Sequence, residues 1–261
     1  MRRLVAWSMI GALSLAACSR PGPSSASMAA LTSEAGSPSP GASQAEATPS
    51  GYAREPLRLV TLGDAYTAGT DTLAPKRDSW PAQLAHAMDG GDVRLRLVGN
   101  LAESGQTSED VIRTQLRQLE ALMPDVVTLQ VGVNDIIAND WSLDEYESNV
   151  ASILDELLRT LSPDRVFVIT TPDHTLTPWG SRWGPRDAGH AAVMKANAIL
   201  GSVASERGIT VIDIAAVNER VTQDASLVIG AGPYPTAKQY AGWVEIIGPQ
   251  MQRVLAARAG G

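Results

Sequence analysis

Short hydrophobic runs alternate with helix-like patterns between residues 56 and 261. The runs are bounded by turn residues and do not alternate strictly between apolar and polar positions. This pattern is typical of parallel strands, because side chains on both faces of such a strand are covered. The predicted strands are Leu57–Leu62, Val93–Val98, Val126–Val131, Val166–Thr170 and Thr210–Ile214.

The segments between the runs carry helix signals. Ser142 stands three residues before Glu145, an arrangement that resembles a capping box. The apolar residues that follow at helical spacing are Tyr146, Val150, Ile153, Leu154, Leu157 and Leu161. A second helix is predicted to begin in a similar way at Thr107.

The last predicted helix begins at about Thr236, and Pro249 is expected to kink or interrupt it. Its apolar face consists of Tyr240, Trp243, Val244 and Ile247. Five strands that alternate with helices predict a doubly wound parallel sheet in one α/β domain of residues 56–261. Ligands of such sheets bind beyond the carboxyl ends of the strands. The loops after strands one, two, three and five are therefore the expected place for chemistry.

The first 17 residues have the pattern of a secretory signal. Arg2 and Arg3 precede the apolar stretch from Leu4 to Ala17, which is too short for an ordinary membrane span. The end of this stretch, Leu15 to Cys18, resembles a bacterial lipobox, in which the cysteine is lipidated and becomes the new N-terminus. A plain signal peptide that happens to contain a cysteine is the alternative. We expect an exported protein anchored to the cell membrane or envelope through Cys18.

Composition narrows the possible partners. Residues 18–55 are rich in Ser, Pro, Ala and Gly and cannot bury enough apolar surface to fold, so a flexible tether is predicted. The formal net charge of −7 argues against a nucleic-acid partner. Cys18 is the only cysteine, which excludes an intrachain disulfide and thiol catalysis in the domain. No cofactor is indicated, and the sequence leaves the oligomeric state open.

Three loop motifs follow the first three predicted strands. They are Gly63-Asp64-Ala65, the stretch Gly99–Thr107 that contains Gly105, and Gly132-Val133-Asn134-Asp135. Together, in this order, they resemble the GDS, oxyanion-glycine and GxND blocks of the SGNH/GDSL hydrolases, which act on esters and on acylated sugars or lipids. Ser79-Trp80-Pro81 and Thr171-Pro172-Asp173 also resemble this family. The resemblance covers nearly the whole domain and implies a flavodoxin-like three-layer α/β/α sandwich with a five-stranded parallel sheet.

The resemblance also implies a catalytic triad, and this chain departs from it at all three positions. The nucleophilic serine falls on Ala65, whose methyl group can neither attack a carbonyl nor release a proton. The closing Asp-x-x-His block falls on Ala231 and Tyr234. A phenol, with a pKa of about 10, is a poor general base at neutral pH. We therefore expect no intact catalytic residues.

The oxyanion-stabilising groups that the resemblance implies are retained. They are the backbone N–H groups of Ala65 and Gly105 and the side chain of Asn134, and we expect them to converge on one point. The alternative for Gly105 is that a glycine is needed there only for an unusual turn conformation. Asp64, Tyr234 and His174 are expected around the same pocket, although capping of the loop is the alternative for Asp64.

A relocated catalytic centre is the main rival. Asp187 and His190 form a literal Asp-x-x-His string, but helix capping is expected of them. The loop of His174 can overhang the pocket, but a solvent-facing position is favoured for this histidine, and a surface or packing role is expected for His86. Tyr66 and Thr67 offer hydroxyl groups near Ala65, but each needs a base.

Trp179 and Trp183 either stack on a sugar or acyl chain or pack their loop onto the domain. Metal binding has no support from ligand-like spacing of histidines and carboxylates. Three functions stay open at this point. The leading one is a non-catalytic module that binds an ester, acyl or glycan-type ligand or a carboxylate. The others are an active esterase with relocated groups and a surface domain without a small-molecule ligand.

Overall fold

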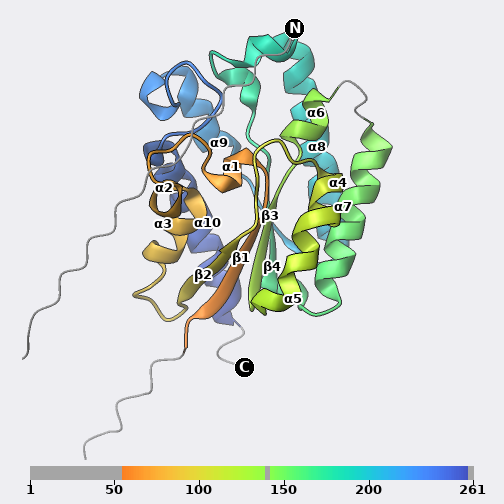
Figure 1. Ribbon diagram of the computed structural model, residues 1–261, viewed down its shortest axis with the longest axis vertical. Coiled ribbons are helices and arrows are strands. Elements are labelled where there is room, and N and C mark those ends of the chain that lie inside the picture. Colours follow the sequence, from red (N-terminus) through yellow and green to blue (C-terminus); the bar gives the residue numbers. More distant parts are fainter. Residues whose placement is uncertain (1–54, 139–141, 258–261) are drawn as a thin grey trace, which may run out of the picture. The chain divides into compact units, whose positions relative to one another are not determined.

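A five-stranded parallel sheet lies at the centre of the computed structural model (Figure 1), which describes residues 55–138 and 142–257. The strand order β2-β1-β3-β4-β5 is that of flavodoxin-like sheets, which confirms the expected sandwich. The strands are β1 (Leu57–Gly63), β2 (Leu95–Asn100), β3 (Val126–Gln130), β4 (Val166–Ile169) and β5 (Thr210–Ile212). The predicted signal sequence, Cys18 and the tether up to residue 54 lie outside the described residues.

Two hydrophobic cores lie on opposite faces of the sheet. Along β4, Phe167 and Ile169 enter one core, whereas Val166 and Val168 enter the other. Because neighbouring side chains point to opposite faces and both faces are buried, the strand reads as a continuous apolar run. Helices α3 and α10 cover the first face, and α7 and α8 cover the second (Figure 1). These helices are α3 (Trp80–Ala87), α7 (Leu143–Leu158), α8 (Arg186–Glu206) and α10 (Ala237–Ala257).

Helix α7 begins as its sequence predicts. The Ser142 hydroxyl accepts a hydrogen bond from the Glu145 N–H at 3.3 Å, and the predicted apolar face is buried as far as Leu157. Helix α10 runs continuously through Pro249, so this proline does not interrupt the helix, and a kink at this position stays a prediction. Only one backbone hydrogen bond is lost at a proline inside a helix, and α10 is held by its buried face against α3.

The segment after Thr107 is less regular than its sequence predicts. The capping box forms, because Thr107 accepts from the Asp110 N–H while the Asp110 carboxylate accepts from the Thr107 N–H. The helix then changes pitch several times before it ends. The pieces are α4 (Ser108–Asp110), the π-helical turn η1 (Val111–Gln115), the 3-10 turn η2 (Leu116–Gln118) and α5 (Leu119–Leu122).

Short helices begin in the loops at the carboxyl ends of the strands, near the top of Figure 1. They are α1 (Ala65–Ala68), α2 (Pro75–Asp78), α6 (Val133–Ile137) and α9 (Ala215–Asn218).

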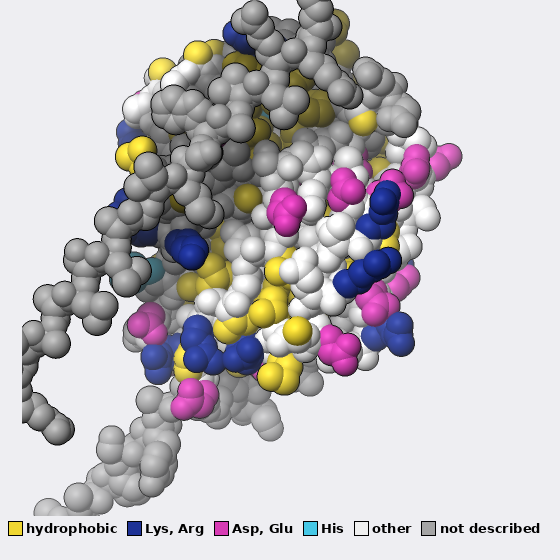
Figure 2. Space-filling model, in the orientation of Figure 1, with side chains coloured by type: hydrophobic (Ala, Val, Ile, Leu, Met, Phe, Trp, Pro, Cys, Tyr) yellow, Lys and Arg dark blue, Asp and Glu magenta, His cyan; other side chains and the backbone are white. Residues whose placement is uncertain are grey.

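Figure 2 shows that positive and negative side chains lie near one another on the visible face. Two exposed ion pairs are Arg94 with Asp89 and Arg207 with Asp155. No helix among the described residues is long and apolar enough to cross a membrane.

Candidate functional site

The loop after β1 presents Ala65 at the first position of α1. Asp64 caps this helix, since its carboxylate accepts a hydrogen bond from the Tyr66 N–H at 3.0 Å. Ala65 is 4% exposed, so its methyl group is largely packed inside the protein. Gly63 has a φ of 152°, and a Cβ there would come within 2.2 Å of the Gln130 carbonyl oxygen. Only glycine therefore allows β1 to end so close to β3.

Gln115 connects the loops after β1 and β2. Its buried amide oxygen accepts a hydrogen bond from the Gly63 N–H at 2.9 Å, and its amide nitrogen donates to the Gly63 carbonyl oxygen at 2.7 Å. The same nitrogen donates to the side-chain oxygen of Gln106. Gln106 follows Gly105 directly. The loop that carries Gly105 is therefore fixed against the end of β1.

Asn134 connects the loop after β3 to the same place. Its amide nitrogen donates a hydrogen bond to the Gln106 carbonyl oxygen at 2.8 Å. The amide nitrogen of Asn134 carries two protons, and this bond uses one of them. The three loops that carry Ala65, Gly105 and Asn134 thus share one hydrogen-bond network.

Two of the expected oxyanion donors have unused hydrogen-bonding capacity. Within the part of the chain that the structure describes, the backbone N–H groups of Ala65 and Gly105 donate to no protein acceptor. Gly105 has a φ of 84°, and a Cβ there would have no neighbour within 4 Å. Its requirement for glycine is therefore conformational, and this does not decide whether its N–H also serves as a donor. The convergence of the three donors on a single ligand oxygen stays a prediction.

Asp135 secures the β2 and β3 loops from the other side. Its carboxylate accepts hydrogen bonds from the Ser108 hydroxyl at 2.5 Å and from the Ser108 N–H at 3.0 Å. Burial raises the pKa of Asp135, although the bonds from Ser108 counteract this effect. Asn149 adds a hydrogen bond of 3.1 Å to the Ser108 hydroxyl.

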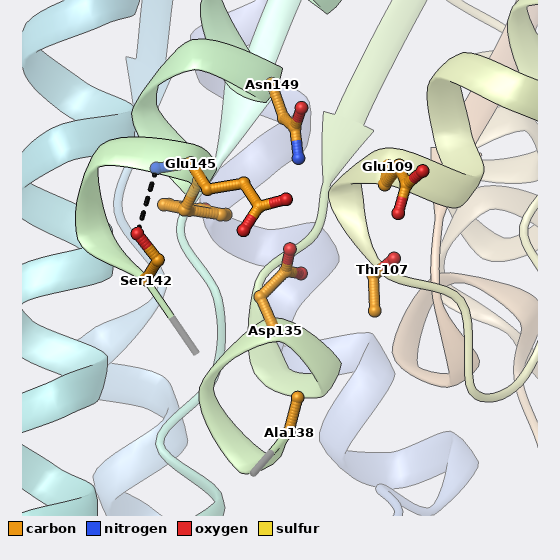
Figure 3. Close-up of a pocket in the computed structure, with 8 residues that line it drawn as sticks. Thr107, Glu109, Asp135, Ala138, Ser142, Glu145 and Asn149 are labelled. Carbon is orange, nitrogen blue, oxygen red and sulfur yellow. Dashed lines mark hydrogen bonds between the residues drawn. The ribbon is translucent and has the colours of Figure 1, made fainter. Parts of the chain in front are cut away.

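A small acidic pocket of about 100 Å³ lies next to this contact. Figure 3 shows the side chains of Glu109, Asp135 and Glu145 around it. Three carboxyl groups repel a ligand carboxylate, so this pocket does not suit a carboxylate ligand. Its remaining lining residues are Thr107, Ala138, Ser142, Tyr146 and Asn149.

The segment that resembles the closing Asp-x-x-His block forms a tight turn. The Ile229 N–H donates to the Tyr234 carbonyl oxygen at 2.8 Å, and the Gly232 N–H donates to the Ile229 carbonyl oxygen at 3.0 Å. Ala231 is exposed at this turn. The Tyr234 ring lies edge-on to the Tyr66 ring, with the centroids 5.9 Å apart. Tyr234 therefore stands beside the loop of Ala65, as its place in the motif implies.

The hydroxyl groups next to Ala65 are poor replacements for a serine. Thr67 is completely buried, and its hydroxyl donates to the Gln130 side-chain oxygen at 3.1 Å. Tyr66 is also buried, which raises the pKa of its phenol well above the usual value. A thiol is excluded by composition, because Cys18 is the only cysteine.

Beneath the Ala65 loop, four polar atoms are buried without a hydrogen-bond partner among the described residues. They are the second carboxyl oxygen of Asp64, the hydroxyl groups of Tyr66 and Tyr240, and the indole nitrogen of Trp243. Burial raises the pKa of Asp64 to about 7, against the opposing effect of the Tyr66 N–H. Asp64 therefore caps α1, which is the capping role given above as the alternative for this residue. It also lies in a poorly solvated environment.

The histidines differ from their expected roles in two of three cases. His86 is exposed on α3, as expected. The expectation that His174 faces solvent is wrong, because it is 2% exposed and packs against Trp183 with ring centroids 5.1 Å apart. Burial lowers the pKa of His174. The third histidine, His190, takes a role that its Asp-x-x-His string does not reveal.

His190 pairs with Asp173 rather than with Asp187. Its Nδ1 atom lies 2.6 Å from the Asp173 Oδ2 atom. Asp187 lies in the first turn of α8, where the helix dipole stabilises a negative charge. The residue at the N-cap is Pro185, and no side chain caps the helix. Asp187 thus lies near the N-cap, as expected, but it does not cap the helix, and His190 bonds to Asp173 instead. The Thr171-Pro172-Asp173 motif marked the position of Asp173 without revealing its partner.

Comparison with known proteins decides the family. The sequence model of the GDSL-like lipase/acylhydrolase family matches residues 61–242. The chain belongs to this family. The GDSL-like chain has no match among curated protein sequences.

Solved structures with the same fold include an α/β hydrolase and an acetylxylan esterase. An α/β hydrolase enzyme from the metagenome of Lake Arreo, Spain, is 20% identical with a TM-score of 0.59, over 76% of this chain and 94% of that chain. An acetylxylan esterase from Geobacillus stearothermophilus is 17% identical with a TM-score of 0.59, over 76% of this chain and 93% of that chain. Catalytic mutants of that esterase, in which a serine, an aspartate or a histidine is replaced by alanine, give similar matches.

Residues suited to a metal ion are not brought together in the described part of this GDSL-like chain. No group of three or more His, Cys, Asp or Glu residues there has a metal-binding arrangement.

Proposed function

We propose that this GDSL-like protein binds an ester, acyl or glycan-type ligand at the cell envelope without cleaving it. The observation that carries the proposal is the buried methyl group of Ala65, which stands where the GDS motif of the family has its serine. The neighbouring hydroxyls do not replace the serine, because Thr67 is committed to Gln130 and Tyr66 is a buried phenol. Covalent catalysis of the family's kind therefore lacks the nucleophile that its first step requires.

The retained loop network supports ligand binding. Gln115 and Asn134 hold the loops through backbone contacts that do not involve the triad positions. Unused N–H groups at Ala65 and Gly105 suit a carbonyl or carboxylate oxygen. The similar acetylxylan esterase makes an acetylated xylo-oligosaccharide a suitable first ligand to test. Anchoring through Cys18 would hold the domain at the envelope.

Binding can be tested with purified full-length protein in detergent. Acetylated xylo-oligosaccharide is expected to raise the melting temperature through preferential binding to the folded state. The Asn134→Ala variant should bind about tenfold more weakly, because one hydrogen bond to the ligand oxygen is lost. Asn149→Ala is the matched control, since Asn149 donates to Ser108 at the acidic pocket and should leave binding unchanged.

Two outcomes would reject the proposal. Equal affinity of wild type and Asn134→Ala would show that the ligand does not use the predicted donors. No stabilisation by acetylated oligosaccharides, fatty-acyl esters or small carboxylates would favour a surface domain without a small-molecule ligand.

The second candidate is an active hydrolase with a relocated centre, and the Asp173–His190 pair favours it. A carboxylate at Nδ1 orients an imidazole for proton transfer at its other nitrogen. His190 lacks a serine partner at position 65, so in this reading it would activate water. Acetate release by wild type that disappears in His190→Ala would establish this candidate. Release at the buffer rate would exclude it.

A further inference from the structure

The loop between β4 and α8 lies at the carboxyl edge of the sheet (Figure 1). It carries two tryptophans, Trp179 and Trp183. Trp183 ends the 3-10 turn η5 (Gly180–Trp183) and is 38% exposed, whereas Trp179 is half-buried. Their ring centroids are 6.4 Å apart and the planes meet at 66°. The Trp183 ring also packs on buried His174. An exposed indole is thus held in place by aromatic neighbours.

Close backbone packing and several hydrogen bonds hold this loop on the domain. A Cβ at Gly180 would lie 2.4 Å from the Thr175 Cα atom, so the two backbones are in close contact. The Arg186 guanidinium donates hydrogen bonds to the carbonyl oxygens of Thr175 and Thr177. Asn218 donates to the Asp173 carbonyl oxygen at 3.2 Å and connects the loop to α9.

Polar groups flank the indoles. The Arg182 guanidinium carbon lies 4.1 Å from the centre of the Trp179 ring. On the other side of His174 stands α8, and a Cβ at Gly189 would lie 3.6 Å from the Nε2 atom of that histidine. Helix α8 also packs against the turn that carries Trp183. His190 follows Gly189 directly on this helix and bonds to Asp173, the residue before His174.

The tautomer of His190 follows from its partner. Asp173 is buried, and its Oδ1 atom accepts hydrogen bonds from the Thr175 N–H at 2.9 Å and the Thr175 hydroxyl at 2.6 Å. Oδ2 faces the Nδ1 atom of His190 at 2.6 Å, so Nδ1 carries the proton. In the neutral ring, Nε2 is then a hydrogen-bond acceptor. The His190 side chain is 55% exposed, so a ligand can reach it.

We propose that Trp179, Arg182, Trp183 and His190 form a sugar-binding platform. An indole face packs against the C–H groups of a sugar ring, while a fixed imidazole and a guanidinium accept from and donate to its hydroxyl groups. An acyl chain would instead need an apolar groove that contains neither a cation nor an exposed hydrogen-bond acceptor. The inference rests on the proposed function and assigns the glycan part of the ligand to this loop, apart from the carbonyl part at Asn134.

A deacetylated xylo-oligosaccharide separates the two parts, since it lacks the acyl carbonyl. We expect full-length wild type to bind it, and Asn134→Ala to bind it equally well. Trp183→Ala should weaken binding about tenfold through loss of the stacking surface. His190→Gln should weaken it about fivefold through loss of the oriented acceptor. His86→Ala, which removes an exposed histidine on α3, is the matched control.

Trp183→Phe guards against a merely structural effect, because it keeps an aromatic face against His174. This variant should retain most of the affinity. The inference is overturned if deacetylated oligosaccharide fails to bind wild type, or if Trp183→Ala and His190→Gln bind it as wild type does. In either case, acetylated ligand that still depends on Asn134 would leave the proposed function standing.

Discussion

Replacement of Asp64 by asparagine should change how the stability of the domain depends on pH. The Asp64 carboxyl group is fully buried, and only one of its oxygens has a hydrogen-bond partner, the Tyr66 N–H. Asparagine has nearly the same shape, and its amide oxygen can accept the same bond. The variant therefore removes the ionisation and keeps the cap of α1.

The magnitude follows from the pKa of Asp64. Burial raises this pKa from 3.8 to about 7. When folding raises the pKa of a carboxyl group, the contribution of that group to stability is fully present only below its unfolded pKa. That contribution is lost as pH rises from about 4 to about 7, because the unfolded chain ionises first. The loss amounts to about 4 kcal/mol. For a domain of this size it corresponds to roughly 8–16 °C in melting temperature.

Urea unfolding between pH 4 and pH 8 measures the effect. Wild type and Asp64→Asn should have similar free energies of unfolding near pH 4, and the variant should be about 4 kcal/mol more stable at pH 8. Burial raises the pKa of Asp135 in both proteins, so its effect cancels in the comparison. Asp224→Asn is the control. The Lys238 and Ser226 contacts lower the pKa of Asp224 to about 2, so its stabilising effect is lost only below about pH 4. Parallel curves for wild type and Asp64→Asn would refute the reasoning.

Three further predictions concern anchoring, catalysis and the loop network. Cys18→Ala should move the protein from the detergent phase to the aqueous phase, or leave its signal uncleaved, because the lipid anchor is lost; equal aqueous partitioning of fully processed wild type and variant would contradict this. Joint Ala65→Ser, Ala231→Asp and Tyr234→His replacement should raise hydrolysis of short-chain aryl esters by about 100-fold or more, since nucleophile, base and orienting carboxylate return together; an unchanged rate would show that the pocket no longer accepts an ester. Gln115→Ala should lower the free energy of unfolding by about 2–3 kcal/mol in urea titrations, because the buried groups of Gly63 lose their partners; a loss below about 0.5 kcal/mol would count against the network.

The fold was predictable because its signals are local. Each strand of the sheet is a short apolar run with both faces buried, and the apolar face of α7 repeats at helical spacing. Strand ends shifted by a residue or two, as at β2, which begins at Leu95 rather than Val93. The irregular helix after Thr107 was not predictable, because its pitch changes where the Gln115 side chain bonds to Gly63 in a distant loop.

The candidate site was only partly predictable for the same reason. Motifs located the loops of Ala65, Gly105 and Asn134, since each follows a strand directly. The pairing of His190 with Asp173 depends on how α8 packs on the loop after β4, and no spacing rule encodes it. The burial of His174 likewise depends on Trp183, which covers it from the same loop.

The central claim is that this GDSL-like domain binds an acylated ligand and leaves it intact. Its most direct test is one sample of full-length protein with acetylated xylo-oligosaccharide, in which bound ligand and released acetate are both followed by NMR. We predict saturable binding that Asn134→Ala weakens, with acetate released no faster than in buffer. Acetate release at a rate typical of esterases, or the absence of any binding, would contradict the claim.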